Sequence, residues 1–567
     1  MQISLKKQAA RGEALITVLI IAGVICIILF SMLQLSSNST VNAYGRVDWD
    51  KSFYAAENAM VWAAQNAFDN SLAAGSSNYY STAAGTLPTR DLICSSSTDP
   101  AFQGAWVTIV QPANQPANNF QITSSARVNN KVRTLQTQIT VRPASSVFDY
   151  EYFLNNWGWW WGSTITGNGG QRANWDFDFR GGPTVNGAIY AADQVQDNEI
   201  PYQNYSSPPF AGQAGADETN LVHDGAQSVT MPNLLNFSNY MVTAMANTAS
   251  NGLWLGSTQV VFGVLSNSYT PNPGGNAGNL SPQTGLYAVG TAANPITIKG
   301  TVVIPGDLII QGIIKGQGTL YVGGNLYLAN NVSYSNAPNF SALPESQSPT
   351  NRDAWVAASQ TNDLVAYAVR GSILGGDVTD SSDWYPNCFT MSGSGLQNVG
   401  DESHLGADGI SGTGDDNTAF LHADGSMSTW YDADGDGTVN GDYNYNNDIN
   451  MTSSRASYIK GYPKDSNGNP LAYNQLATTD IGMLQGIFYT DHAAAIRLKQ
   501  SQAYIDGVIV SRNEQIIFQN YLNIIYDSRV NSRYHNNPNN IINLGLPWGK
   551  PISVTSFAEL APNHAGL

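Results

Sequence analysis

The sequence has little of several features that mark common classes of protein. Only 12% of its 567 residues are charged, and Asp and Glu outnumber Lys and Arg by 42 to 25, which argues against a nucleic-acid partner. The three cysteines are too few for a disulfide framework, although Cys94 and Cys388 remain a candidate pair. The six histidines lack metal-ligand spacing, and neither a G-x-S-x-G motif nor a phosphate-binding glycine loop occurs. We therefore expect a protein that is not an enzyme.

An apolar run from Ala14 to Leu35 follows a short basic segment that contains Lys6, Lys7 and Arg11. A helix of about 22 residues can cross a hydrocarbon core of about 30 Å. Because basic residues stay on the cytoplasmic side, the remainder of the chain is expected outside the inner membrane. The run is too long for a cleaved secretory signal. A simple membrane anchor remains an alternative.

The boundary between the basic and the apolar segment is Gly12, and Ala-Ala-Glu-x-Ala follows at residues 55–59. This order resembles the N-terminus of the PilX-like minor pilins of type IV pili. The resemblance implies a leader of residues 1–12, cut by a prepilin peptidase between Gly12 and Glu13, and a helix that packs among other pilin subunits. Most pilins carry glutamate at the fifth mature position, where this chain has Thr17. The tip pseudopilin of type II secretion systems also lacks it, so the resemblance implies a minor, tip-located subunit. The alternative is that Glu13 takes over the role of that glutamate.

Residues 13–145 are expected to form a pilin-like domain. After the membrane helix (about 14–35), apolar residues recur at helical spacing from 47 to 74, which predicts that the helix continues into water. Two alternating segments, 120–128 and 132–141, are separated by Asn-Asn-Lys, which indicates a β-hairpin. A long helix on a small antiparallel sheet is the plan of pilins, and it makes the predicted fold class α+β.

The remainder of the chain is predicted to be mainly β. From 295 to 328, apolar strands of three to four residues end in regularly spaced glycines, which are Gly300, Gly306, Gly312, Gly318 and Gly324. This spacing indicates a β-solenoid, whose coils stack on one another. A β-sandwich is the alternative. Similar glycine-containing strands on both sides favour a solenoid in two parts, 146–335 and 481–567, and such bodies resemble those attached to PilX-type N-termini.

Residues 336–480 are predicted to be an insertion, because they are rich in Asp, Asn, Gly and Ser and poor in apolar runs. One motif has alternating carboxylates and a glycine at its sixth position, the arrangement that converges on one Ca²⁺ ion. It departs from the EF-hand pattern at position 12, where Tyr443 replaces glutamate. An acidic turn without metal is the alternative. The expected Ca²⁺ ligands are Asp432, Asp434, Asp436, Thr438, Asn440 and Asp442, and a second candidate turn contains Asp408, Asp415 and Asp416.

Two patterns leave alternatives open. The tryptophan-rich segment 157–162 is either a platform for a carbohydrate ligand or, as we favour, an apolar plug that caps the first solenoid coil where the pilin domain joins. Some acidic residues are close enough in sequence for the carboxylate pairs of an enzyme: Asp176 and Asp178, or Asp377, Asp380 and Asp383. A membrane-anchored solenoid enzyme acting on polysaccharide is therefore the runner-up. The leading hypothesis is a filament subunit that lies in the inner membrane before assembly and at the cell surface or pilus afterwards, with a head for adhesion or assembly priming.

Overall fold

The computed structural model describes part of the chain. Among the described residues, no helix is long and apolar enough to cross a membrane. The expected membrane helix and the leader lie outside them. The described residues are 43–72, 91–94, 102–110, 112, 119–129, 131–141, 143–155, 158–197, 200–201, 222–232, 234, 237–265, 284–342, 349–377, 391–392, 395–396, 420–421, 427–428, 453–478, 481–491, 493–498, 500–512, 514–535, 544–548 and 552–560.

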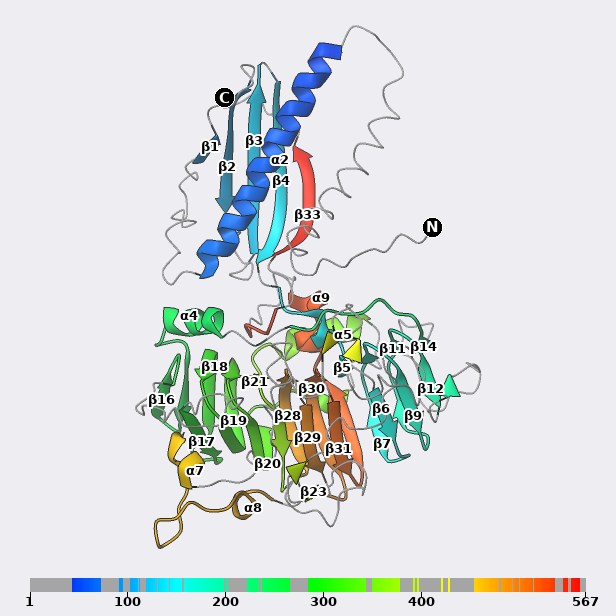
Figure 1. Cartoon of the computed structure of the whole chain (residues 1–567), viewed down its shortest axis with the longest axis vertical. Helices are drawn as coiled ribbons and strands as arrows, with labels where there is room; N and C mark the ends of the chain where they lie inside the picture. Colours follow the sequence, from blue (N-terminus) through cyan, green and yellow to red (C-terminus); the bar gives the residue numbers. More distant parts are fainter. Residues whose placement is uncertain are drawn as a thin grey trace, which may run out of the picture.

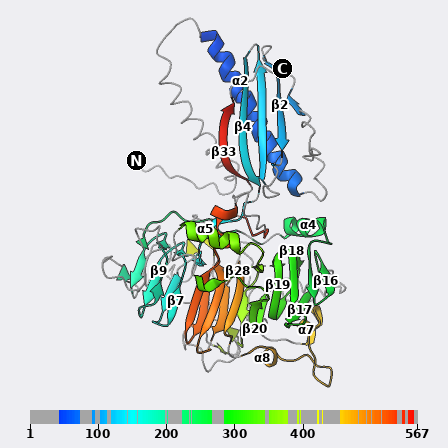
Figure 2. The ribbon, with the colours of Figure 1, turned by 180° about the vertical axis from the view of Figure 1, so that it is seen from behind.

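One part of the molecule is a long helix packed on one face of an antiparallel sheet, which we call the helix–sheet unit (Figures 1 and 2). The helix buries small and apolar side chains at helical spacing, among them Phe53, Ala56, Met60 and Ala63. The expected hairpin is confirmed, with Asn129 at its turn in a left-handed conformation (φ 50°). The unit consists of α2 (Ala43–Leu72) and, in order of pairing, β1 (Asp91–Cys94), β2 (Phe102–Val110), β3 (Asn119–Val128), β4 (Lys131–Val141) and β33 (Ile552–Leu560).

The two ends of the helix–sheet unit meet different parts of the chain. The start of α2 lies beside the β3–β4 turn, where the Asn129 side-chain amide donates a hydrogen bond to the Asp48 carboxylate at 2.9 Å. At the opposite end of the sheet, Val141 of β4 pairs with Ile552 of β33. The chain leaves the unit after Val141 and returns at Ile552. All residues between them are therefore inserted at the end of the sheet that is farthest from the start of α2 (Figure 1).

Most of the inserted chain forms parallel strands, and we call this part the parallel body. Ile296 pairs with Ile314, 18 positions later. In the C-terminal part, Met483 pairs with Tyr504, 21 positions later. Each turn of the chain thus lies on a neighbouring turn. Strand β21 is buried at every position, as expected of a parallel strand covered on both faces.

The strands of the parallel body are short in its N-terminal part and longer in its C-terminal part. The N-terminal strands are β5 (Tyr152–Leu154), β6 (Gly158–Trp161), β7 (Ile165–Gly167), β8 (Gln171–Ala173), β9 (Phe177–Arg180), β10 (Thr184–Val185), β11 (Ile189–Ala191), β12 (Val195–Asp197), β13 (Ile200–Pro201) and β14 (Val222–His223). The others are β15 (Gly252–Leu255), β16 (Thr258–Phe262), β17 (Gly285–Gly290), β18 (Ile296–Ile304), β19 (Leu308–Val322), β20 (Leu326–Tyr334), β21 (Leu364–Val369), β22 (Ile373–Gly375), β27 (Ile459–Lys460), β28 (Met483–Thr490), β29 (Ala493–Leu498), β30 (Ala503–Ser511), β31 (Glu514–Gln519) and β32 (Leu522–Tyr526).

Short helices connect or cover these strands. They are η1 (Ser146–Asp149), α4 (Ser238–Ala246), η2 (Phe340–Ala342), α5 (Pro349–Ala358), α7 (Ser453–Tyr458), α8 (Tyr473–Leu476), η4 (Ser528–Val530) and α9 (Ser532–His535). Two small hairpins are formed by β23 (Met391–Ser392) with β24 (Gly395–Leu396), and by β25 (Phe420–Leu421) with β26 (Met427–Ser428).

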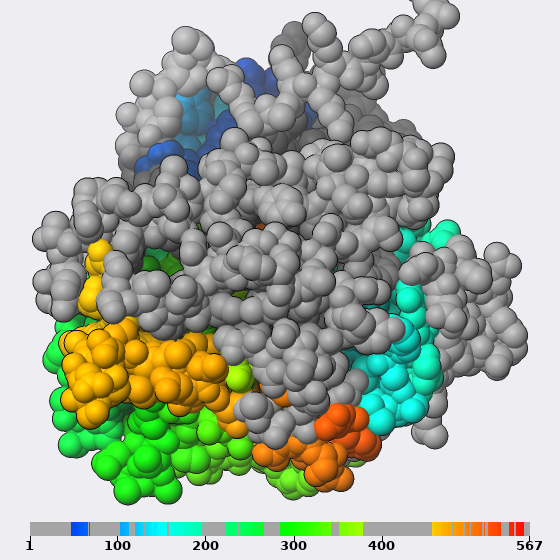
Figure 3. Space-filling view, turned by 60° about the horizontal axis from the view of Figure 1, so that its bottom comes forward, coloured from blue at the N-terminus to red at the C-terminus, as the bar shows by residue number. Residues whose placement is uncertain are grey.

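The order of stacking in the parallel body differs from the order of the chain. The last turns of the C-terminal part stack on the first turns of the N-terminal part, because β30 pairs with β5 and β32 pairs with β7. Their surfaces, cyan and orange-red, adjoin in Figure 3. The chain therefore enters the parallel body at η1, in the middle of the stack of turns. It leaves the body at η4, beside the point of entry. The Asp149 carboxylate accepts hydrogen bonds from Ser532 and links the entering and leaving segments.

Of the five regularly spaced glycines, Gly300, Gly312 and Gly318 lie within strands, whereas Gly306 and Gly324 lie in the turns between strands. The sequence predicted strands of three to four residues, whereas β18 has 9 residues and β19 has 15. Gly312, inside β19, has φ +92° and pairs with Gly290 on the neighbouring turn. A Cβ atom at Gly312 would overlap the Gly290 carbonyl oxygen. Glycine is therefore required where the backbone bends against an adjacent turn.

Strand pairing also places two segments differently from the expected boundaries. The segment 481–567 was expected to hold the second part of the solenoid and a C-terminal segment, but β33 pairs with β4 in the helix–sheet unit. The segment 336–480 was expected to be a separate insertion, but β21 pairs with β19 and β28 inside the parallel body. The partners are 47 to 411 residues apart in sequence, as in the pairs Gln317–Leu364 and Val141–Ile552, and pairing over such separations leaves no signal in the local sequence.

Candidate functional site

The residues predicted to bind Ca²⁺ and to be processed lie outside the described part of the chain. These are Gly12, Glu13, Asp432, Asp434, Asp436, Thr438, Asn440 and Asp442, together with Asp408, Asp415 and Asp416 of the second candidate turn. Within the described residues, no group of three or more His, Cys, Asp or Glu side chains is placed to hold a metal ion. The candidate sites considered below are therefore a helix surface and a cleft.

The first candidate is an apolar stripe on α2, on the face turned away from the sheet. Val47, Tyr54 and Val61 are spaced by seven residues, so they align along the helix. They are 49%, 48% and 41% exposed, and Trp62 beside them is 38% exposed. The buried stripe lies on the opposite side and contacts the sheet. A helix that is apolar on two opposite faces has a second surface available for a partner.

The second candidate is a cleft where the two parts of the parallel body meet. Two strand ladders continue across this join, through the pairs β30–β5 and β32–β7. A third ladder is interrupted at the join. Strand β31 pairs with β29 on one side and β6 pairs with β9 on the other, but within the described residues no pairing links β31 to β6. A cavity of about 290 Å³ lies between these two strands. We call it the seam cleft.

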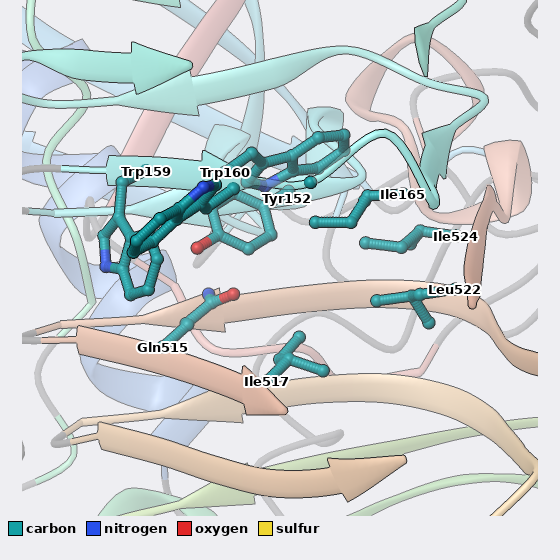
Figure 4. A pocket seen from close by; sticks show the side chains of 10 residues that line it. Tyr152, Trp159, Trp160, Ile165, Gln515, Ile517, Leu522 and Ile524 are labelled. Carbon is teal, nitrogen blue, oxygen red and sulfur yellow. The ribbon is translucent and has the colours of Figure 1, made fainter. Parts of the chain in front are cut away.

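Aromatic and aliphatic side chains line the seam cleft from both sides (Figure 4). In Figure 4, Trp159, Trp160 and Tyr152 come from the N-terminal strands, and Gln515 and Ile517 come from β31. None of the lining residues carries a charged side chain. The lining residues are Tyr152, Trp159, Trp160, Trp161, Gly162, Ile165, Gln515, Ile517, Leu522 and Ile524.

The described tryptophans of the tryptophan-rich segment differ in their burial, and Trp157 lies outside the described residues. Trp160 is 4% exposed and packs edge-on against Tyr152, with ring centres 5.6 Å apart, as an apolar plug would. Trp161 is 45% exposed at the mouth of the cleft, and the Arg180 guanidinium lies 5.9 Å from the centre of its ring. Trp159 between them is half-buried. Trp160 also packs against Phe177 and Phe179, so its burial comes from neighbouring strands of the N-terminal part.

One polar group in the cleft is incompletely satisfied. Gln515 is 3% exposed, and its side-chain nitrogen donates to the carbonyl oxygens of Phe153 at 2.9 Å and Ile509 at 3.3 Å. Its oxygen, Oε1, is buried and accepts no hydrogen bond from any described residue. A buried acceptor without a donor costs about 1–3 kcal/mol. No sequence motif includes Gln515, so its role in the cleft could not be predicted from the sequence.

The candidate enzymatic carboxylates have structural partners. Asp178 is fully buried and pairs with Arg180 at 2.6 Å. Asp176 accepts a hydrogen bond from the Gln194 backbone at 3.0 Å, and burial raises the pKa of its carboxyl to about 7. Asp377 is buried in the body, whereas Asp380 and Asp383 lie outside the described residues. None of the described members of these pairs lines the seam cleft.

Comparison with known proteins gives a similarity at the level of structure but none at the level of sequence families. No family model matches the sequence, and no curated protein matches it. Among solved structures, the chain is similar to the crystal structure of the competence-associated pilin ComZ from Thermus thermophilus. The identity is 10% and the TM-score 0.27, over 93% of this chain and 99% of that chain. A TM-score of this size does not establish a common fold.

Proposed function

We propose that this chain is a minor pilin or pseudopilin subunit of a type IV pilus-like filament, with the parallel body as its extracellular head. The observation that carries the proposal is the place of the insertion. The parallel body leaves the sheet between Val141 and Ile552, at the end farthest from the start of α2. A membrane segment preceding α2 would therefore extend away from the head, which orients the head outward. The 18- and 21-residue offsets between paired strands support a β-solenoid architecture for this head.

The exposed stripe on α2 supports packing against other subunits. Once the subunits have left the membrane and assembled, Val47, Tyr54 and Val61 contact the helices of neighbouring subunits in the proposed filament. Burying apolar surface stabilises such a contact by about 25 cal/mol per Å². The head would serve adhesion or assembly priming.

The position of the head favours the filament tip. Subunits of a filament follow one another along its axis, and a bulky body at the distal end of a subunit leaves no room for another subunit above it. Thr17, which replaces the glutamate of most pilins, also favours a position at the filament tip. A subunit without that carboxylate cannot neutralise the terminal amine of the subunit it follows, and a buried unpaired charge is costly.

Two variants test the proposal in cells that assemble the filament. Gly12→Ala should block cleavage by the prepilin peptidase and keep the uncut chain in the inner membrane, as read by mass spectrometry of the N-terminus. Tyr54→Glu should permit cleavage but reduce recovery on sheared filaments about tenfold or more, because it places a charge in the proposed contact. Phe262→Glu, which alters a 56% exposed residue of the body, is the matched control and should assemble normally. Normal surface display of the Gly12→Ala variant would contradict the assignment. A label on the wild-type chain that is absent from sheared filaments would also contradict it.

We also propose that the acidic loop from Asp432 to Asp442 binds Ca²⁺. Carboxylates this close disfavour one another's ionised state unless a cation lies among them. Millimolar Ca²⁺ should therefore raise the unfolding temperature of the chain, and a chelator should reverse the gain. Asp434→Ala should remove most of this response in calorimetry, whereas Asp380→Ala should not. A wild-type chain indifferent to Ca²⁺ up to about 10 mM would leave only an acidic turn.

A further inference from the structure

We propose that the seam cleft binds one ring of a neutral carbohydrate. The inference deepens the proposed function, on which it rests for its biological setting, because it names a ligand class for the head. Three properties of the cleft carry it: its shape at the break between β31 and β6, its uncharged aromatic lining, and the buried Gln515 oxygen.

The cleft exists because one of three strand ladders is interrupted. Strands β30 and β32 hold the two parts of the parallel body together at the join. The opening between β31 and β6 is therefore fixed by its neighbours. Binding pockets of about 300–1,000 Å³ hold drug-sized ligands. A cavity of about 290 Å³ suits a single sugar ring, with adjoining rings outside the cleft.

The lining selects for an uncharged ligand with an apolar face. The rings of Trp159 and Trp161 present flat surfaces of negative partial charge, on which the C–H face of a pyranose stacks favourably. No charged side chain lines the cavity. At the mouth, the Arg180 guanidinium is already paired with Asp178 at 2.6 Å. The net charge of −17 further disfavours anionic polysaccharides.

The Gln515 oxygen adds a requirement that purely apolar ligands do not meet. Its side-chain nitrogen is held by the Phe153 and Ile509 carbonyls, so the oxygen has a fixed position among the lining residues. A sugar hydroxyl donating to this oxygen would satisfy it. An acyl chain would leave it buried without a donor. The cleft thus combines a stacking surface with one directional acceptor, as sugar sites require.

Titration calorimetry on the purified full-length chain in detergent tests the inference. The probes are cellotriose, maltotriose and chitotriose, with trigalacturonic acid as the anionic comparison. We expect at least one neutral trisaccharide to bind at one site per chain, and the anionic one not to bind. Trp161→Ala should weaken binding about tenfold or more, as is typical for removal of an aromatic that dominates an interface. Ile517→Trp, which fills the cleft, should abolish it.

The matched control is Trp254→Ala, which removes a partly exposed tryptophan of β15 outside the cleft and should bind like the wild type. Unchanged unfolding temperatures would show that the variants fold. The proposal is overturned if no neutral trisaccharide binds up to about 10 mM, or if Trp161→Ala and Trp254→Ala bind equally. An extended peptide could instead pair with the free strand edges of the cleft, as an added β-strand. Binding of a hexapeptide of alternating Val and Thr, with no binding of sugars, would assign the cleft to this role. Because the purified chain needs no filament, these results are independent of the processing and assembly tests above.

Discussion

Arg529 shows how a single buried charge holds the parallel body together. Its guanidinium is fully buried and pairs with Asp527 at 2.6 Å. It also donates hydrogen bonds to the carbonyl oxygens of Ser359 at 3.1 Å and Asp363 at 3.0 Å. One side chain therefore joins the segment leaving the body to the turn that precedes β21. A charge in this position is tolerable only because every side of it is paired.

Replacing Arg529 with leucine should destabilise the chain by about 3–5 kcal/mol, because Asp527 would remain buried without its partner. The midpoint of urea unfolding, followed by circular dichroism, measures the loss. Arg533→Leu is the control, since Arg533 and Asp353 are half exposed and 3.5 Å apart. Its effect should stay below about 1 kcal/mol. Equal losses in the two variants would show that the buried pair has no special role.

At the scale of elements, β33 completes the helix–sheet unit from a distant part of the sequence. It pairs with β4, and Thr137 of β4 donates a side-chain hydrogen bond to the Ser556 carbonyl at 2.7 Å. Arg133 of β4 contacts the Glu559 carboxylate and lies over the rings of Trp49 and Phe53 in α2. The C-terminal strand is thus coupled through β4 to the helix.

Phe557→Ser should loosen this strand, because Phe557 packs against the core of the helix–sheet unit. We expect a loss of about 1–2 kcal/mol, visible as faster hydrogen exchange in a peptide covering 131–141. Val554→Ser is the matched control on the same strand, since Val554 is 46% exposed, and should leave the exchange unchanged. If both variants behave alike, β33 does not stabilise β4 through its packing.

The same elements show what the sequence could and could not predict. The alternation across 120–141 predicted the β3–β4 hairpin, because both strands and their turn are local. The segment 552–560 also alternates in part, but its partner lies some 400 residues earlier, and register with a distant strand has no local signal. The glycine spacing of 300–324 indicated stacked turns without giving their order. The seam cleft was unpredictable for the same reason, since it depends on which turns meet.

At the scale of the whole molecule, buried carboxyls make stability depend on pH. Burial raises the pKa of Asp176 to about 7, and raises the pKa values of Asp149 and Asp506 to about 6. In the unfolded chain these groups lose their protons near a pKa of about 3.9. The folded state therefore binds more protons between about pH 4 and 7, and its stability falls as pH rises through that window.

We expect a higher unfolding temperature at pH 5 than at pH 7.5. Asp176→Asn should raise the value at pH 7.5 by about 2 °C, because the amide oxygen can still accept the Gln194 backbone hydrogen bond without a charge. The same variant should have a smaller effect at pH 5. Asp465→Asn is the control, since Asp465 lies in a surface turn, where hydrogen bonds from Asn469 lower the pKa of its carboxyl. Scanning calorimetry at the two pH values measures these unfolding temperatures. An unfolding temperature of the wild type that rises from pH 5 to 7.5 would refute the prediction.

The connection through β4 and β33 has a mechanical consequence. The parallel body is attached to both strands at the same end of the sheet, opposite the start of α2. Tension between a held head and an anchored helix therefore acts along the strands. Because the hydrogen bonds of an antiparallel ladder run across the strands, this tension loads the bonds between β3 and β4 together, in shear, instead of opening them one after another. In the proposed filament, the sheet would therefore transmit force from the head to the helix.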